Sequence, residues 1–253
     1  MAQAESLRYG FIGGGFITAF HLKAIQQVRG IEVAGLTSRT RPEKLAKFCR
    51  ENGLGEAKIY DSVREMVPHV DVIAIFGPNF TRIETVEAIV DEVKAGAELK
   101  GLICEKPLGR NLAEARRMVE LVKPLGIPTA YFENQIHMKS INAALAQLTP
   151  VIETMGAPVL VRSGEEHAGP HNAWFWDPVQ QGGGVMADMG CHCLGAGWYA
   201  LTPPGKDVRF LEPISVSADV SLLKWGQPKW RQLLLDKYGV DYAKTPADDF
   251  ATG

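Results

Sequence analysis

The chain has 253 residues, of which 46% are hydrophobic and 22% charged, and its formal net charge is −2. This length and composition leave room for one large or two modest globular domains with a substantial core. The near-neutral charge gives no electrostatic reason to expect nucleic acid or a membrane surface as a partner. No apolar run approaches the roughly 20 residues of a transmembrane helix, and residues 1–8 lack the apolar core of a signal peptide.

The cysteines do not have the spacing of a disulfide framework. Cys49 and Cys104 lie inside apolar segments, whereas Cys191 and Cys193 flank a histidine. We therefore expect a reducing, cytoplasmic location. Three adjacent residues on a helix point in different directions, so Cys191-His192-Cys193 is a poor zinc site and we expect no metal.

The first half of the chain alternates predicted strands with predicted helices. Short apolar runs predict strands at residues 8–12, 31–36, 70–76, 101–104 and 128–132. Helical periodicity predicts helices between them, at residues 16–28, 41–50, 81–95 and 112–125, the last with Asn111 as its N-cap. The alternation indicates a parallel sheet covered on both faces, in a domain that spans residues 1–132.

The character of the sequence changes after residue 132. Helical segments extend to residue 155, and a second helix is predicted over residues 185–201, after a loop rich in Gly, Pro, His and Trp. Strands are predicted at residues 158–162 and, from apolar–polar alternation, at residues 214–220. These elements predict a second α/β domain with an open, mostly antiparallel sheet over residues 133–253.

Residues 249–253 resemble the start of a further strand. The second domain then has few strands to pair, and a two-stranded sheet is marginal alone. We therefore expect this sequence to be a fragment, or a protein whose last part is absent from it.

A glycine-rich turn follows the first predicted strand. It has the first two glycines of the G-x-G-x-x-G motif, with Thr18 in place of the third. Gly13 permits the tight turn, and Gly15 lets the backbone approach a pyrophosphate at the start of the following helix, beside Phe16 and Ile17. A plain glycine-rich turn is the alternative, but the strand–turn–helix context predicts a Rossmann domain that binds NAD(H) or NADP(H).

The segment after the second strand bears on the choice of cofactor. NAD sites have an acidic residue there for the ribose hydroxyl, whereas residues 37–41 contain none. Arg39 or Arg41 could instead pair with a 2′-phosphate, with Ser38 adding a hydrogen bond. This pattern favours NADP slightly, and the alternative is solvated arginines with NAD as cofactor.

Glu105-Lys106-Pro107 ends the strand at residues 101–104. The carboxyl ends of parallel strands face the cofactor crevice, so we expect Glu105 and Lys106 to lie there. Pro107 biases Lys106 toward extended backbone, from which its amine could stabilise negative charge on a reacting oxygen or move a proton. A surface lysine paired with Glu105 is an equally open interpretation.

Asp188 and His192 lie four residues apart in a predicted helix and so share one face. Histidine titrates near neutrality and suits a general base for a substrate hydroxyl. Asp188 could orient the substrate or make the imidazole more basic, and the glycines at 182–184 allow close packing before the helix. A helix-stabilising Asp–His pair is the alternative.

The loop before these glycines contains His167, His171 and Trp176. Imidazole and indole groups suit the hydroxyls and faces of a sugar, and specificity often lies on loops. The alternative is a packed loop, because Trp is more often a core residue.

Together, the glycine turn, the Glu-Lys-Pro strand end and the Gly-Gly-Gly segment with Asp188 and His192 resemble the glucose-fructose oxidoreductase / inositol dehydrogenase / rhizopine catabolism (Gfo/Idh/MocA) family. The resemblance implies a Rossmann domain, an open-sheet C-terminal domain and a homo-oligomer built partly through that sheet. It implies NAD(P)-dependent hydride transfer to or from a secondary alcohol or ketone of a sugar or cyclitol. Lys106 and His192 would be the catalytic pair with Asp188 beside them, and Pro78 and Asn79 match the pair that borders the cofactor.

Arg82 stands where the family often has a histidine, three residues after the asparagine. Two other functions stay open. One is glycoside cleavage through transient oxidation, which net reduction of the cofactor would separate from a dehydrogenase. The other is a non-catalytic dinucleotide-binding regulator, which Lys106→Ala would leave unaffected.

Overall fold

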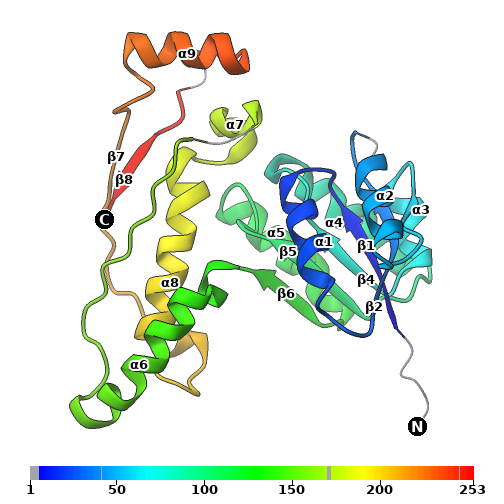
Figure 1. Ribbon diagram of the computed structural model, residues 1–253, viewed down its shortest axis with the longest axis horizontal. Helices are drawn as coiled ribbons and strands as arrows, with labels where there is room; N and C mark the ends of the chain where they lie inside the picture. The colour runs from blue at the N-terminus through cyan, green and yellow to red at the C-terminus, as the bar shows by residue number, and fades with distance from the viewer. Residues whose placement is uncertain (1–5, 41, 170–171, 245) are drawn as a thin grey trace. The chain divides into compact units, whose positions relative to one another are not determined.

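In the computed structural model the chain divides into two compact units, one up to Phe132 and one from Glu133 onward, each with its own sheet and core (Figure 1). The structure describes residues 6–40, 42–169, 172–244 and 246–253. Within these ranges, no helix is both long enough and apolar enough to cross a lipid bilayer.

The first unit is built on a six-stranded parallel sheet of order β3-β2-β1-β4-β5-β6. Its strands are β1 (Leu7–Ile12), β2 (Ile31–Thr37), β3 (Lys58–Ile59), β4 (Val72–Ile75), β5 (Gly101–Glu105) and β6 (Thr129–Phe132). The order reverses between β1 and β4, whose carboxyl ends form the switch point where doubly wound sheets bind ligands. The sequence predicted five of these strands and missed β3, because two paired residues leave no periodic pattern.

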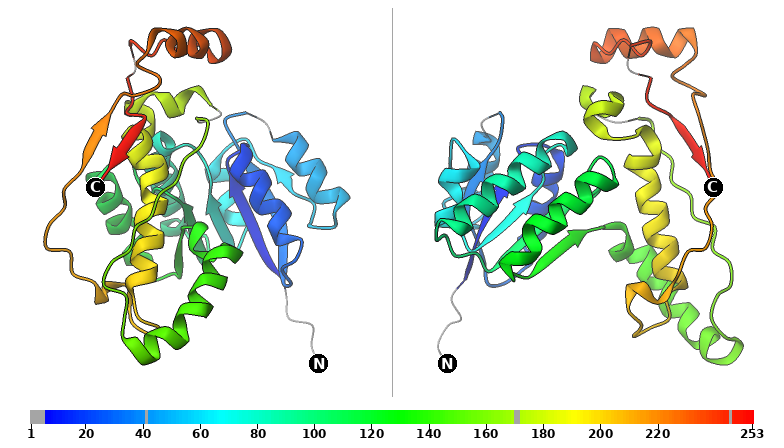
Figure 2. Two further views of the ribbon diagram at one scale, coloured as in Figure 1. Left: turned by 60° about the vertical axis from the view of Figure 1, so that its left-hand side comes forward. Right: turned by 180° about the vertical axis from the view of Figure 1, so that it is seen from behind.

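Helices cover both faces of this sheet (Figures 1 and 2). The α-helices are α1 (Phe16–Ile25), α2 (Glu43–Glu51), α3 (Val63–Met66), α4 (Arg82–Lys94) and α5 (Leu112–Val122). Three 3-10 turns join them, namely η1 (Val67–His69), η2 (Asn79–Thr81) and η3 (Lys123–Leu125). The predicted N-cap is confirmed: Asn111 Oδ1 accepts a 3.0 Å hydrogen bond from the Glu114 amide.

Consecutive side chains of the central strands enter two separate cores. Phe11 packs with α1 and α2 on one face, whereas Ile12 packs with α3, α4 and α5 on the other. In β4, Ala74 joins the first core, and Ile73 and Ile75 join the second. Because both faces are buried, these strands have continuous apolar sequences rather than alternating ones.

The second unit is mostly helical. Its helices are η4 (Gln135–His137), α6 (Lys139–Met155), η5 (Ala173–Trp176), α7 (Pro178–Gln181), the π-helical η6 (Met186–Gly190), α8 (Cys191–Leu201), η7 (Val208–Phe210) and α9 (Pro228–Tyr238). The strands β7 (Asp219–Ser221) and β8 (Phe250–Thr252) form an antiparallel pair. A small core gathers Trp176, Trp225, Leu234, Val240 and Tyr242.

The sheet predicted for this unit is only partly formed. Residues 158–162 were predicted as a strand, but in the described chain they pair with no strand, and Val159 is 98% exposed. Residues 214–220 were also predicted as a strand, yet pairing begins only at Asp219. An apolar–polar alternation forms a strand only where a neighbouring strand supplies the backbone ladder, and here β8 does so for three residues. The further strand expected near residue 250 is confirmed as β8.

Candidate functional site

The glycine turn lies against the end of β4. Gly13 has φ +128°, and a Cβ there would lie 2.8 Å from the carbonyl carbon and oxygen of Phe76, so this position requires glycine. Thr18 is fully buried, and its hydroxyl donates a 2.9 Å hydrogen bond to the Gly13 carbonyl. Thr18, at the position of the motif's third glycine, therefore closes the turn with its side chain.

Gly15 has a different environment. Its backbone is extended, at φ −93° and ψ −166°, and a Cβ would meet no atom within 4 Å. It is the N-cap of α1, and no side chain of the described residues caps that helix. Open space beside the first turn of a helix suits a phosphate group, because backbone amides and the helix dipole both favour an anion there. The turn therefore fits the pyrophosphate of a dinucleotide.

The end of β5 is held by buried polar groups. The Glu105 carboxylate is buried, with Oε1 2.9 Å from Nε2 of His21 and Oε2 accepting a 2.8 Å hydrogen bond from the Lys106 amide. Burial also raises the pKa of the adjacent Cys104 thiol. This network fixes the backbone from which the Lys106 side chain extends.

Arg82 also contacts this strand end and was not predicted as a site residue. Its side chain is 3% exposed, and it donates hydrogen bonds to the carbonyls of Glu105 (2.7 Å), Lys106 (3.1 Å) and Gly77 (3.5 Å). A planar guanidinium with five donors can serve several carbonyls at once. Asn79, three residues earlier in η2, is likewise buried at 3% exposure, directly after Pro78.

The end of β2 carries the residues considered for cofactor choice. Ser38 follows β2, and its Oγ would lie 2.7 Å from a Cβ on Gly14, so it borders the glycine turn. Arg39 is exposed, and its guanidinium carbon lies 5.2 Å from the centre of the Phe80 ring. Arg41 is outside the described residues.

In the second unit, His192 on α8 is paired with Glu133. Nδ1 of His192 lies 2.5 Å from Oε1 of Glu133, and the residues are 6% and 8% exposed. A hydrogen bond from this ring to an ionised carboxylate requires the proton on Nδ1, because an ionised carboxylate can only accept. The sequence prediction missed Glu133, because it lies 59 positions away from His192.

Asp188 lies in η6, one helical element before His192. Its Oδ2 is 4.0 Å from Nε2 of His167, and Nδ1 of His167 accepts a 2.8 Å hydrogen bond from the Gly169 amide. The structure thus brings together Asp188 and His167, two of the residues expected to contact a substrate. His171 lies outside the described residues.

The glycine segment before η6 packs against Asp248. Gly184 has φ +56°, and a Cβ there would lie 2.5 Å from the Asp248 carbonyl oxygen. That oxygen accepts a 2.9 Å hydrogen bond from the Val185 amide, and an Asp248 carboxylate oxygen lies 3.3 Å from the Met186 amide. The close packing expected of this glycine segment is thus found at Gly184.

Glu133, Cys191 and His192 also place one donor atom each within 4.8 Å of one another. Two ligands of a tetrahedral zinc ion, with bonds of about 2.0–2.1 Å, lie roughly 3.3 Å apart. The 2.5 Å separation in the Glu133–His192 pair is that of a hydrogen bond, and Cys191 Sγ lies 3.3 Å from the Asp188 carbonyl oxygen. We therefore describe these groups as hydrogen-bonded and assign them no ion.

Trp176 does not have the environment expected of a substrate platform. Its side chain is 4% exposed and contacts Trp225 edge-on at 4.8 Å and Tyr242 at 6.2 Å between ring centroids. An indole that is buried to this extent has no exposed face on which a sugar could stack. The structure therefore supports the alternative interpretation, in which Trp176 is a core residue.

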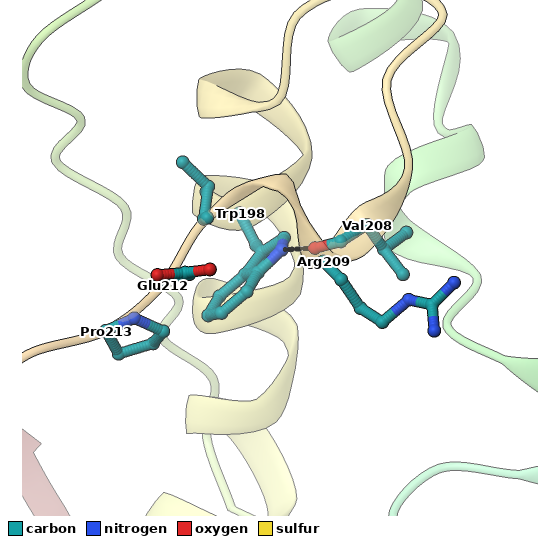
Figure 3. Close-up of a pocket in the computed structure, with 6 residues that line it drawn as sticks. Trp198, Val208, Arg209, Glu212 and Pro213 are labelled. Atoms are coloured by element: carbon teal, nitrogen blue, oxygen red, sulfur yellow. Dashed lines mark hydrogen bonds between the residues drawn. The ribbon is translucent and has the colours of Figure 1, made fainter.

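A cavity of about 620 Å³ lies further along α8 (Figure 3). Its lining residues are Trp198, Val208, Arg209, Leu211, Glu212 and Pro213. Trp198 follows His192 by six residues, which is a rotation of about 600° around the helix, so the two side chains lie on different faces. Trp198 is held there by a 2.6 Å hydrogen bond from its indole to the Val208 carbonyl (Figure 3). This cavity contains none of the predicted site residues.

The strand order and the glycine turn are those of a Rossmann fold, the class of domain that binds dinucleotides. Residues 7–130 match the oxidoreductase family with an NAD-binding Rossmann fold, Gfo/Idh/MocA, and the chain belongs to this family.

Individual relatives of the chain are also oxidoreductases. The 1,5-anhydro-D-fructose reductase of Ensifer adhaerens is 29% identical over 188 residues, which cover 73% of this chain and 54% of the reductase. The myo-inositol 2-dehydrogenase of Thermotoga maritima is 25% identical over 221 residues, covering 86% of this chain and 59% of the dehydrogenase. The chain thus spans somewhat over half the length of the curated relatives it matches.

Solved structures show the same fold. GenD2 from gentamicin A biosynthesis, in complex with NAD, superimposes with a TM-score of 0.67 at 20% identity, covering 81% of this chain and 56% of that chain. Levoglucosan dehydrogenase, in complex with NADH and levoglucosan, has a TM-score of 0.60 at 22% identity and covers 78% of this chain and 54% of that chain.

Proposed function

We propose that this chain provides the dinucleotide-binding domain and part of the catalytic machinery of an NAD(P)-dependent oxidoreductase. Its reaction would be hydride transfer between the nicotinamide and a secondary alcohol or ketone of a sugar or cyclitol. The observation that carries the proposal is the glycine turn. Backbone geometry requires glycine at position 13, whereas Gly15 faces open space at the start of α1, where a phosphate could lie. The names of the relatives support the substrate class.

When bound, the nicotinamide supplies the acceptor or donor of the hydride. In the direction of oxidation, His192 takes the proton of the substrate hydroxyl at Nε2, since Nδ1 is occupied by Glu133. Lys106, which the family resemblance pairs with His192, stabilises negative charge on a reacting oxygen of the substrate. Asp188, beside His167, orients the substrate hydroxyls.

Several residues support this chemistry by holding the backbone. Arg82 and Glu105 fix both sides of the peptide that precedes the Lys106 side chain.

Other residues border the cofactor. Pro78 and Asn79 lie beside it at the end of β4, and Phe16 and Ile17 form the first turn of α1 beneath the pyrophosphate.

We further propose that the cofactor is NADP(H) in preference to NAD(H). Arg39 is an exposed cation at the end of β2, where the adenosine ribose lies in Rossmann folds, and Ser38 adds a hydroxyl. A guanidinium pairs well with a phosphate, because two parallel N–H bonds reach it at once.

The test is a fluorescence titration of the purified chain with NADPH and NADH, followed by a screen of sugars and cyclitols for absorbance change at the nicotinamide band. We expect NADPH to bind more tightly, and Lys106→Ala to retain binding while losing at least about 100-fold in kcat. Lys94→Ala, at an exposed lysine in the last turn of α4, is the matched control. Failure of both dinucleotides to bind would contradict the proposed function.

A further inference from the structure

The Glu133–His192 pair is a buried contact between two parts of the second unit that are remote in sequence. Glu133 lies directly after β6, whereas His192 lies in the first turn of α8. Both side chains are only 8% exposed, so water contributes little to either. A buried carboxylate is costly unless hydrogen bonds satisfy it, and this one accepts from His192 Nδ1 at 2.5 Å and from the Gln135 amide at 3.0 Å.

The helix α8 is built to admit this carboxylate. Gly195 lies three residues after His192, and a Cβ there would lie 3.0 Å from Cγ of Glu133 and 3.5 Å from its carboxyl carbon. Glycine in the middle of a helix is less favourable than alanine. Glycine at position 195 therefore makes the helix less stable, but it lets the Glu133 side chain approach the helix face that carries His192.

We propose that Glu133 is the positioning residue for His192. By accepting the Nδ1–H bond, it fixes the imidazole in the tautomer whose Nε2 has a lone pair, and it holds the ring plane. Among the described residues, Nε2 of His192 makes no hydrogen bond, so this nitrogen is the one left to receive a proton. A neutral histidine has one donor nitrogen and one acceptor nitrogen, so a proton held on Nδ1 leaves Nε2 as the acceptor.

This inference rests on the proposed function only in its last step, the transfer of a hydroxyl proton to Nε2. The hydrogen bond and the tautomer are properties of the chain without cofactor or substrate. The proposal can therefore be tested by a measurement that needs neither of them.

The first experiment records long-range ¹H–¹⁵N spectra of the full chain labelled on histidine, with His192→Gln to assign the signal. We expect His192 to show a protonated Nδ1 with a strongly downfield proton, as short hydrogen bonds to carboxylates give. Glu133→Met fills a similar space without a strong acceptor, so that proton signal should disappear and the ring should shift toward the Nε2–H tautomer. Glu153→Gln, which neutralises an exposed carboxylate on α6 of the same unit, should leave the signal unchanged.

The second experiment measures steady-state kinetics. Glu133→Met should lower kcat by about 10- to 100-fold, with KM changed less than about threefold, because positioning the base affects the chemical step more than binding. Glu133→Gln keeps a neutral acceptor and should lose less. Gly195→Ala retains both partners but pushes on Glu133, and should give an intermediate kcat in a well-folded protein.

The outcomes separate the two proposals. A His192 signal with Nε2–H in the unmodified chain, or a Glu133→Met variant with unchanged kcat, would overturn the positioning role. If Lys106→Ala abolishes turnover while Glu133→Met does not, only the role of Glu133 fails. If the chain turns over no sugar or cyclitol, the proposed function fails, and the spectra still decide whether Glu133 fixes the tautomer.

Discussion

Arg82 donates a 2.7 Å hydrogen bond from Nη1 to the carbonyl oxygen of Glu105, which ties the first residue of α4 to the last residue of β5. A second donor reaches the carbonyl of Lys106. The buried Arg82 side chain, 3% exposed, therefore fixes the backbone around Lys106, the lysine to which we assign a catalytic role.

We expect Arg82→Leu to lower the free energy of unfolding by about 2–3 kcal/mol, because buried carbonyls lose their donors. Urea-induced unfolding followed by circular dichroism would measure this change. Arg117→Leu, at a side chain that is 54% exposed, is the control and should change stability by less than about 0.5 kcal/mol. Equal effects of the two substitutions would contradict the structural role of Arg82.

The two glycines of the turn should respond differently to alanine. Gly13→Ala places a Cβ 2.8 Å from the Phe76 backbone at φ +128°, so we expect a loss of at least about 2 kcal/mol in stability. Gly15→Ala meets no protein atom and should leave stability within about 0.5 kcal/mol. We expect it nevertheless to weaken dinucleotide binding at least tenfold, because the methyl group blocks close approach of the pyrophosphate. Normal binding by a stable Gly15→Ala protein would count against this site.

Arg39 should discriminate between the two dinucleotides. Removing one charged hydrogen-bond donor from a phosphate costs about 1.5–3 kcal/mol, so Arg39→Ala should raise the Kd for NADPH by roughly 10- to 100-fold. The Kd for NADH should change less than about twofold. Arg29→Ala, at another exposed arginine, is the control. Tighter binding of NADH by the unmodified chain, unaffected by Arg39→Ala, would identify NAD as the cofactor.

Asp71 should make the first unit sensitive to acid. Hydrogen bonds from Arg8 lower the pKa of this buried carboxyl from 3.8 to about 2, with a further contribution from Lys100 at 3.2 Å. A carboxyl whose pKa is lower in the folded state stabilises the fold above its unfolded pKa, and this stabilisation is lost as the pH falls through the folded value. We expect Asp71→Asn to cost about 2 kcal/mol at pH 6.

The same comparison at low pH provides the test. The stability difference between the unmodified chain and Asp71→Asn should shrink as the pH falls from about 4 to about 2. Urea unfolding at a series of pH values would measure it. A difference that stays constant across this range would mean that the ion pairs of Asp71 do not carry the effect.

The first unit could be predicted largely from sequence. A parallel strand buried on both faces is a continuous apolar run, and helices show their own period, so five strands and the main helices were recognisable. Glycine at position 13 is required by local backbone geometry and was equally visible. The second unit was less predictable, because residues 158–162 and 214–220 have strand-like patterns but form a ladder only where a partner strand exists.

The sequence alone determined the local features of this protein: the strand–turn–helix with Gly13 and Gly15, the Glu105-Lys106 strand end, and the helix that carries His192. Tertiary structure decided which groups surround them. Arg82 reaches Glu105 across 23 positions and Glu133 reaches His192 across 59, while Trp176 is drawn into a core with Trp225. Periodicity and spacing report interactions within a few residues, whereas hydrogen bonds of buried charges depend on which distant segments the fold brings into contact.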